Sequence, residues 1–339
     1  MNGGRLRLNV AFLALALASF SCDTPMDTLR PQSNFADSIA SLYWETIGLY
    51  SLVLALVVVL LILVLARHSS RMGSTREPPV HVQEHLMLEA AWTVGPAAIL
   101  LLVAFPAIVI NFDSQPSQPP ANALHVVVIA HQWWWEFRYP AMGIDTADEA
   151  HVVVDRPVYF ELHSADVIHS FWVPKLGGKR DVIPNHTNEL ILTPYEVGEY
   201  YGQCAEFCGL SHANMRIRVF VDSRERFHKW ADNQRSEPRE PDPTSPDFRR
   251  VAAGMRIFAG APCVICHEVR GISEGTIGPN LSHIGSHATL AGGTYTNTPT
   301  ELAAWIEHPD QMKPGAQMPS LALSRPQLDD LVAYLESLH

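Results

Sequence analysis

The chain has 339 residues, enough for two or three domains of about 100–200 residues each. Charged residues make up 17%, against about 25% in ordinary soluble domains, which indicates that apolar membrane segments dilute the composition. The 24 basic and 35 acidic residues give a formal net charge of −11. This charge argues against nucleic-acid binding, because phosphate contacts need clustered Lys and Arg. The five cysteines are an odd number, so they cannot all pair in internal disulfides.

The N-terminus is typical of a secretory signal peptide, predicted over residues 1–21. Two arginines precede the charge-free run Leu8–Phe20, which is shorter than the about 20 residues that a membrane span requires. Small residues, Ser19 and Ser21, stand just before Cys22, whose position resembles the acylation site of bacterial lipoproteins, although Phe20 occupies a position where small residues are usual. A lipid-modified Cys22 and a plain cleaved signal with a free thiol both stay open. Residues 22–40 are predicted to form an extracytoplasmic segment.

Two apolar stretches predict a transmembrane helical hairpin over residues 41–111. The 21 residues between Glu45 and Arg67 and the 23 residues between Glu89 and Asp113 carry no charge. Such lengths span a bilayer as a helix, and the arginines of the connecting loop predict a cytoplasmic loop with both ends outside. Glu89 then lies at the cytoplasmic end of the second span. It is either an ordinary boundary carboxylate or a proton entry point.

The pattern changes to short β-branched and aromatic runs within residues 112–232. Pro, Gly and Asn separate these runs, which predicts a β-sandwich or barrel. The segment from 112 to 222 holds 14 acidic and 7 basic residues, so its surface would attract basic partners. The runs predicted as strands are Val126–Ile129, Trp133–Tyr139, His151–Val154, Glu189–Leu192 and Met215–Val221.

Candidate metal ligands concentrate in the sequence CAEFCGLSHANM, which covers residues 204–215. Thiolate, imidazole and thioether ligands together select copper over hard cations. Two cysteines exceed the single one of a blue-copper site, but they can bridge two copper ions with two histidines as terminal ligands. A four-ligand zinc site and a disulfide within the loop are alternatives, although zinc leaves the methionine unexplained. The ligand candidates are His169, Cys204, Cys208, His212 and Met215.

A Pro-rich linker over residues 233–248 leads into a third domain, residues 249–339. Cys263, Cys266 and His267 form the Cys-x-x-Cys-His signature of covalent c-type heme attachment. Its two thiols can reach the two vinyl groups of the porphyrin, while the histidine coordinates the iron. A zinc knuckle or a redox dithiol is the alternative.

The second axial ligand of the iron should be a methionine or a histidine. Met318 is favoured, because its loop, KPGAQMPS, is rich in Gly and Pro and can lie against the ring. Apolar residues at helical spacing over 326–338 predict a terminal helix. The competing candidates for the axial ligand are Met255, Met312, His283 and His287.

Several of these motifs resemble those of a known protein family. His169 followed by CAEFCGLSHANM resembles the binuclear copper (CuA) motif of cytochrome c oxidase subunit II. The stretches LEAAWT (88–93), HQWWWEF (131–137) and FWVPKLGGKRDVIP (171–184) are also similar to that family. The likeness covers about residues 32–221 and implies a cupredoxin fold in which the five candidate ligands hold two copper ions.

The third domain looks like a small class I cytochrome c, with GPNL (278–281) similar to its heme-side loop. An all-α cytochrome fused to a two-helix anchor and an all-β copper domain resembles subunit II of caa-type oxidases.

The resemblance also implies roles for residues outside the ligand set. Glu206 is similar to the residue that gives a backbone carbonyl to copper and a carboxylate to a magnesium shared with subunit I. Glu89 looks like the carboxylate at the mouth of a proton-uptake channel. Trp133 looks like the tryptophan through which electrons enter in that family. The alternative is that it only packs in the core. Trp134 stands where the family more often has Tyr, so only Trp133 and Trp135 carry over directly.

The expected function is that of the electron-entry subunit of a heme-copper terminal oxidase in a bacterial plasma membrane. Electrons from cytochrome c or another upstream donor would pass through heme c and copper to subunit I, which reduces O2 to water with proton pumping. Further oxidase subunits are expected partners. A copper-containing nitric oxide reductase subunit, a stand-alone electron carrier and a copper-storage protein are the alternatives. Because the donor heme is tethered, its electron transfer to copper should depend weakly on salt.

Overall fold

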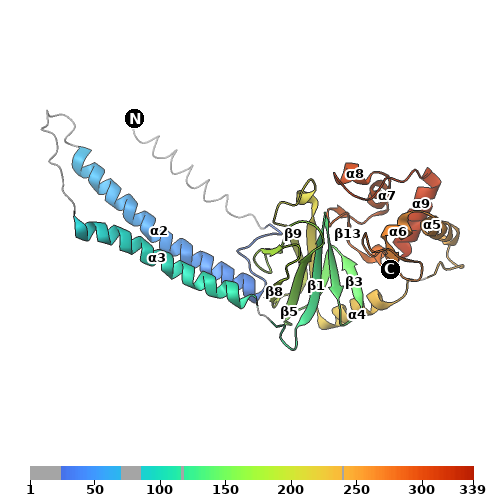
Figure 1. Ribbon diagram of the computed structural model, residues 1–339, viewed down its shortest axis with the longest axis horizontal. Helices are drawn as coiled ribbons and strands as arrows, with labels where there is room; N and C mark the ends of the chain where they lie inside the picture. Colours follow the sequence, from blue (N-terminus) through green and yellow to red (C-terminus); the bar gives the residue numbers. More distant parts are fainter. Residues whose placement is uncertain (1–23, 70–84, 116–117, 239) are drawn as a thin grey trace, which may run out of the picture.

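The computed structural model describes residues 24–69, 85–115, 118–238 and 240–339. A helical hairpin, a β-sandwich and a helical domain follow one another along the length of the molecule (Figure 1). The predicted multidomain architecture is therefore confirmed. The predicted signal peptide, Cys22 and most of the loop between the two spans lie outside the described residues.

Two long helices, α2 (Asn34–Ser69) and α3 (Leu86–Asp113), form the hairpin. Both are long and apolar enough to cross a membrane, and their large apolar side chains are exposed, as expected for helices surrounded by lipid. Pro96 and Pro106 lie inside α3 without ending it. Membrane helices tolerate such interruptions.

Helix α2 begins within the segment 22–40 that the sequence predicted to precede the hairpin. Its first turns are not membrane-facing, because Phe35, Ala36 and Ala40 are buried. Phe35 belongs to the core of the β-sandwich, and the hydroxyl of Ser33 donates a hydrogen bond to the carbonyl of Leu176. The start of α2 therefore packs on the sandwich and fixes where the hairpin leaves it.

The central domain is a sandwich of two five-stranded sheets. The first has the order β3-β2-β1-β5-β8 and the second the order β4-β10-β9-β6-β7. Strand β1 runs parallel to β5, and β10 runs parallel to β4. The strands are β1 (Leu124–His131), β2 (Trp134–Tyr139), β3 (Ile144–Ala147), β4 (Glu149–Val153), β5 (Val158–Ser164), β6 (His169–Trp172), β7 (Arg180–Val182), β8 (Asn188–Leu192), β9 (Gly198–Cys204) and β10 (Arg216–Asp222).

Alternating side chains of the strands build the core between the two sheets. In β1, Val126, Val128 and Ala130 are fully buried, and the residues between them are partly exposed. The five runs that the sequence predicted as strands correspond to β1, β2, β4, β8 and β10. The β-sandwich prediction is confirmed, although the sequence pattern did not indicate the other five strands.

Helix α4 (Arg224–Arg235) leads from the sandwich to the heme-binding domain predicted from the sequence. This domain contains α5 (Phe248–Gly260), α6 (Cys263–Cys266), α7 (Pro299–Glu307), α8 (Pro309–Met312) and α9 (Arg325–Ser337). Its short elements are η2 (Ile284–Ser286) and the strands β11 (Glu268–Val269), β12 (Ser273–Glu274), β13 (Thr289–Leu290) and β14 (Tyr295–Thr296). The predicted terminal helix is confirmed as α9, which buries Leu328, Leu331, Val332 and Leu335.

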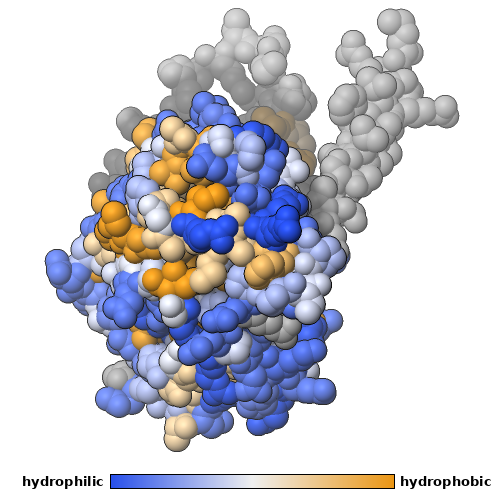
Figure 2. Space-filling view, turned by 90° about the vertical axis from the view of Figure 1, so that its right-hand side faces the viewer, coloured by the Kyte–Doolittle hydropathy of each residue, from blue (hydrophilic) through white to orange (hydrophobic). Residues whose placement is uncertain are grey.

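The helical domain forms the end of the molecule that lies farthest from the hairpin (Figure 1). Viewed from that end, polar side chains dominate the surface, and apolar ones gather in its upper part (Figure 2). The opposite side of this domain contacts the sandwich. Its loops hydrogen-bond to residues of β3, β4 and the segment before β10.

Candidate copper and heme sites

The predicted metal ligands lie at the ends of neighbouring strands in the second sheet. His169 is the first residue of β6, Cys204 is the last residue of β9, and Met215 directly precedes β10. Strand pairing places Phe171 opposite Cys204, and the Cys204 N–H donates to the Met215 carbonyl over 2.8 Å. The sheet therefore brings His169 to a loop that is distant in sequence. The rest of that loop runs through the short helix η1 (His212–Asn214).

The side-chain atoms of all five candidate ligands converge. The Cys204 and Cys208 sulfurs are 3.8 Å apart, and Cys204 Sγ lies 3.9 Å from His169 Nδ1. Cys208 Sγ lies 3.6 Å from His212 Nδ1 and 3.9 Å from Met215 Sδ. His169, the two cysteines and Met215 are buried, and His212 is half-buried. The structure thus brings together every residue that the sequence predicted as a copper ligand.

Groups around the ligands orient them. His169 Nε2 lies 2.8 Å from Asp166 Oδ1, which leaves Nδ1 facing Cys204. Hydrogen bonds of this kind fix the ring orientation of metal-binding histidines. The carbonyl of Glu206 lies 3.2 Å from Cys204 Sγ, while its carboxylate side chain is exposed. The carbonyl therefore faces the sulfur cluster, as the family resemblance implied.

The electrostatics of the two sulfurs favour a bound cation. The pKa of the Cys204 thiol is lowered, because the Cys208 thiol donates a hydrogen bond to it and His169 also stabilises the thiolate. The pKa of Cys208 is raised by the neighbouring thiolate and by burial. Two thiolates this close repel each other unless positive charge lies between them. Both cysteines are free, which argues against the disulfide alternative, and the inward Met215 sulfur favours a soft metal over zinc.

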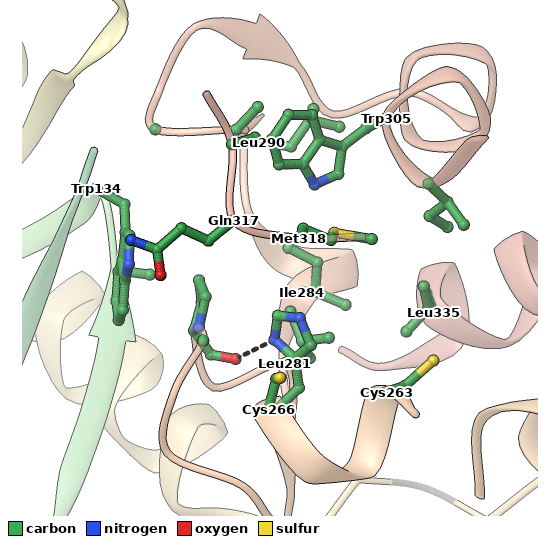
Figure 3. Close-up of a pocket in the computed structure, with 18 of the residues that line it drawn as sticks. Trp134, Cys263, Cys266, Leu281, Ile284, Leu290, Trp305, Gln317, Met318 and Leu335 are labelled. Carbon is green, nitrogen blue, oxygen red and sulfur yellow. Dashed lines mark hydrogen bonds between the residues drawn. The ribbon is translucent and has the colours of Figure 1, made fainter. Parts of the chain in front are cut away.

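An apolar cavity lies beside the predicted heme attachment motif. Met318 lies on one side of it, and Cys263 and Cys266 lie on the other (Figure 3). Trp134 reaches the same cavity from the β-sandwich (Figure 3). The cavity is therefore closed partly by another domain. Its apolar lining includes Phe258, Ile277, Leu281, Ile284, Leu290, Leu302, Trp305, Leu331 and Leu335.

The orientation and the pKa of His267 both suit a metal ligand in this cavity. Its Nδ1 lies 2.8 Å from the Pro279 carbonyl, which leaves Nε2 for an iron ion. Burial lowers the pKa of His267, and the neutral imidazole is the form that binds metals. A Cβ atom at Gly278 would lie 2.7 Å from His267 Cε1, so the GPNL loop packs directly on the ring. The residues present fit a covalently attached heme.

Two of the five candidates for the second axial position line the cavity, namely Met318 and His287. The other three, Met255, Met312 and His283, are not part of its lining. The Nε2 atom of His287 lies 3.2 Å from the Thr146 hydroxyl of the sandwich, so this ring is engaged across the domain boundary. The geometry therefore favours Met318.

The three adjacent tryptophans have different surroundings. Trp133 donates from Nε1 to the Cys208 carbonyl over 2.9 Å, and it also lines the heme cavity. Trp134 stacks on His131 with 4.2 Å between the ring centroids. Trp135 is fully buried beside His169, with 6.1 Å between the ring centroids. The position that departs from the family pattern, Trp134, thus faces the cavity.

Sequence reasoning missed Lys313 and Asp148, which both line the cavity and are both buried. Lys313 is the only lysine in residues 249–339 and stands five positions before Met318 in the same loop. A single lysine in the whole domain was the signal that could have pointed to it.

The predicted proton entry point, Glu89, is partly exposed in the first turn of α3, where the His85 N–H donates to its carboxylate over 3.2 Å.

Soft-metal ligands in one domain and a heme cavity in the next define a class of membrane-anchored redox proteins with more than one cofactor. Three family models match the chain. They describe the cytochrome c oxidase subunit II transmembrane domain over residues 31–110, its periplasmic domain over 141–222, and cytochrome c over 251–339.

Two relatives extend this likeness over almost the full length. Cytochrome c oxidase subunit 2 of Alkalihalophilus pseudofirmus is 33% identical over 98% of this chain and 96% of its own. The Bacillus subtilis protein of the same name is 32% identical over 98% of this chain and 97% of its own. The crystal structure of the periplasmic domain of subunit II of cytochrome oxidase from Bradyrhizobium japonicum is 29% identical, covering 34% of this chain and 96% of that one with a TM-score of 0.33.

The chain belongs to the cytochrome c oxidase subunit II family, in the form that carries a C-terminal cytochrome c domain. It is therefore a subunit of an oxidoreductase. Membership implies a binuclear copper centre in the β-sandwich and heme c in the helical domain, and the residues at both sites fit these cofactors. From here on, the two parts are called the copper domain and the heme domain.

Proposed function

We propose that the chain takes electrons into its heme domain and delivers them through its copper domain to subunit I of the oxidase. The observation that carries this proposal is the shared wall between the two sites. Trp133 lines the heme cavity and at the same time contacts the carbonyl of Cys208, a copper-ligand candidate. The indole of Trp133 therefore lies between the two sites.

In this proposal His267 and Met318 hold the heme iron, and Cys263 and Cys266 hold the porphyrin. His169, Cys204, Cys208, His212 and Met215, with the Glu206 carbonyl, hold the copper ions. When bound, each cofactor supplies a centre that gains and loses single electrons. The chain's own residues give the heme cavity an apolar lining, and Asp166 fixes the orientation of His169.

The topology proposal places the loop between α2 and α3 in the cytoplasm and both cofactor domains outside the cell membrane. The arginines of the loop support this orientation. Subunit I would then meet the exposed side of the copper loop, where Phe207 and Leu210 are 77% and 79% exposed. Glu206 is exposed on the same loop and is the proposed magnesium ligand. O2 reduction and proton pumping belong to subunit I, with Glu89 as a proposed proton entry point.

The proposal is tested by absorption and electron paramagnetic resonance spectra of the purified oxidase. The native protein should show a c-type heme band and the signal of a mixed-valence copper pair. Cys204→Ser should abolish the copper signal and spare the heme band. The matched variant Cys266→Ser should weaken covalent heme attachment and spare the copper signal.

Two outcomes would contradict the proposal. One is a native protein, freshly isolated, whose copper loop holds zinc or no metal. The other is an assembled complex that consumes nitric oxide but not oxygen, which would support the nitric oxide reductase alternative.

A further inference from the structure

Hydrogen bonds fasten the heme domain to the copper domain, and Glu149, Thr289 and Gly292 among their partners are buried. The Glu149 carboxylate of β4 accepts hydrogen bonds from the Thr289 N–H over 2.7 Å and from the Ala288 N–H over 3.1 Å. The Arg216 N–H donates to the Gly292 carbonyl over 2.8 Å. Backbone amides from both domains take part, so the relative position of the two domains is specified in detail.

Lys313 is a buried charged side chain of the heme domain at this interface. It is 4% exposed, and its ammonium donates to the Trp133 carbonyl and, over 2.9 Å, to the Ala291 carbonyl. One ammonium thus binds a carbonyl from each domain. A lysine is rarely buried unless it is paired, because removing the charge from water is costly.

Asp148 of the copper domain supplies the opposite charge. It is 6% exposed, and its attraction to the ammonium counteracts the lowering of the Lys313 pKa by burial. Its carboxylate also accepts hydrogen bonds from the Trp135 N–H over 2.9 Å and the Gly292 N–H over 3.1 Å. The carboxylate is therefore held in place by both domains.

Two glycines show how closely the heme domain fits around Lys313 and Trp133. Gly292 has a φ of 74°, and a Cβ atom there would lie 2.0 Å from Lys313 Nζ. Gly315 has a φ of 82°, and a Cβ atom there would lie 2.8 Å from the Trp133 ring. Both positions need a residue that adopts a left-handed backbone and has no side chain. The interface is built around the two side chains.

From these contacts we infer that Lys313 is a positioning residue, which seats the heme domain on Trp133 and so sets the path between the two cofactor sites. The inference rests on the proposed function. Lys313 donates a hydrogen bond to the Trp133 carbonyl, and the Trp133 indole contacts the copper loop. The loop that contains Lys313 continues to Met318. The same seating leaves Trp133 only 8% exposed, so a soluble electron donor cannot contact it and must deliver electrons to the heme domain.

The test replaces Lys313 by methionine in the purified, fully assembled oxidase. The matched control is Lys229→Met, which removes an exposed lysine on α4. The first readout is hydrogen exchange at the interface amides of Arg216, Thr289 and Gly292. We expect exchange at least tenfold faster in K313M and unchanged in K229M, with the core amides of β1 unaffected in both.

The second readout is the rate of copper reduction after a flash delivers one electron to the heme domain. We expect this rate to fall at least tenfold in K313M and to stay unchanged in K229M, while the heme and copper spectra of both variants match the native ones. If K313M does not retain both spectra, Asp148→Asn becomes the deciding variant. It should likewise show faster hydrogen exchange at the interface amides and slower copper reduction.

Native exchange and a native transfer rate in the deciding variant would overturn the inference and leave the proposed function intact. If the native protein lacks the copper signal or the heme band, the proposed function itself fails, and the spectra reveal this before the variants are compared.

Discussion

Trp133 and Met318 mark the two ends of the contact between the domains. Trp133 belongs to the copper domain, and Met318 faces the heme cavity from the loop that Lys313 begins. The same short loop therefore contacts the copper domain at one end and supplies the proposed iron ligand at the other. The role of Met318 as an iron ligand can therefore be tested separately from its role in packing.

Met318→Leu should remove the sulfur ligand of the iron and leave the heme covalently attached. A thioether ligand raises the heme reduction potential, so the potential should fall and the sulfur-to-iron absorption band should disappear. Met312→Leu, which lies outside the cavity lining, is the control and should leave both properties unchanged. If His287 were the ligand instead, the native protein would lack the sulfur-to-iron band, and His287→Gln rather than Met318→Leu would change the heme reduction potential.

At the level of single residues, the sequence was sufficient for most of the two sites. The copper loop and the attachment motif are local, with their ligands only a few positions apart, so spacing alone indicates their chemistry. Lys313 and Trp133 are 180 positions apart, and they meet only because the domains dock. No periodicity or spacing records such a contact, which is why the interface was missed.

Among the elements, the strength of the sequence signal explains part of what could be predicted. Three of the five strands that were missed, β3, β6 and β7, have only three or four residues, too few for alternation to be recognised. The other two, β5 and β9, have seven residues each and were missed in spite of their length. Helix α4 has only a narrow apolar face, since Phe227, Ala231 and Gln234 are its buried residues. The long apolar helices and α9 have strong patterns and were predicted. The start of α2 was missed, because its burial depends on the copper domain.

Helices α5 and α9 form the main contact inside the heme domain, and Gly254 allows their close approach. A Cβ atom at Gly254 would lie 2.0 Å from the Asp330 carbonyl oxygen. Gly254→Ala should therefore destabilise the heme domain by about 1–3 kcal/mol, the usual cost of overpacking. The measurement is the midpoint of thermal unfolding followed by heme absorbance.

Gly260 on the same helix is the control, because a Cβ atom there would meet no atom within 4 Å. Gly260→Ala should leave the midpoint unchanged or slightly higher, since alanine favours helix. Equal midpoints for the two variants would show that the helices can separate without cost.

For the whole molecule, the position of the heme domain shows how the heme is held near the copper domain. A Pro-rich linker suggests a tethered domain whose local concentration depends on linker length. The structure instead shows a seated domain with buried contacts to the copper domain at Glu149, Asp148 and Trp133. Both arrangements make the transfer intramolecular, but only the seated one fixes its path.

The most direct measurement of the central claim is the rate of copper reduction after a flash reduces the heme domain, recorded across protein concentration and ionic strength. Transfer within one chain through a buried interface should proceed at a rate independent of dilution and nearly independent of salt, since buried contacts are weakly screened. A rate that increases with protein concentration, or that falls steeply as salt is added, would contradict transfer inside the chain.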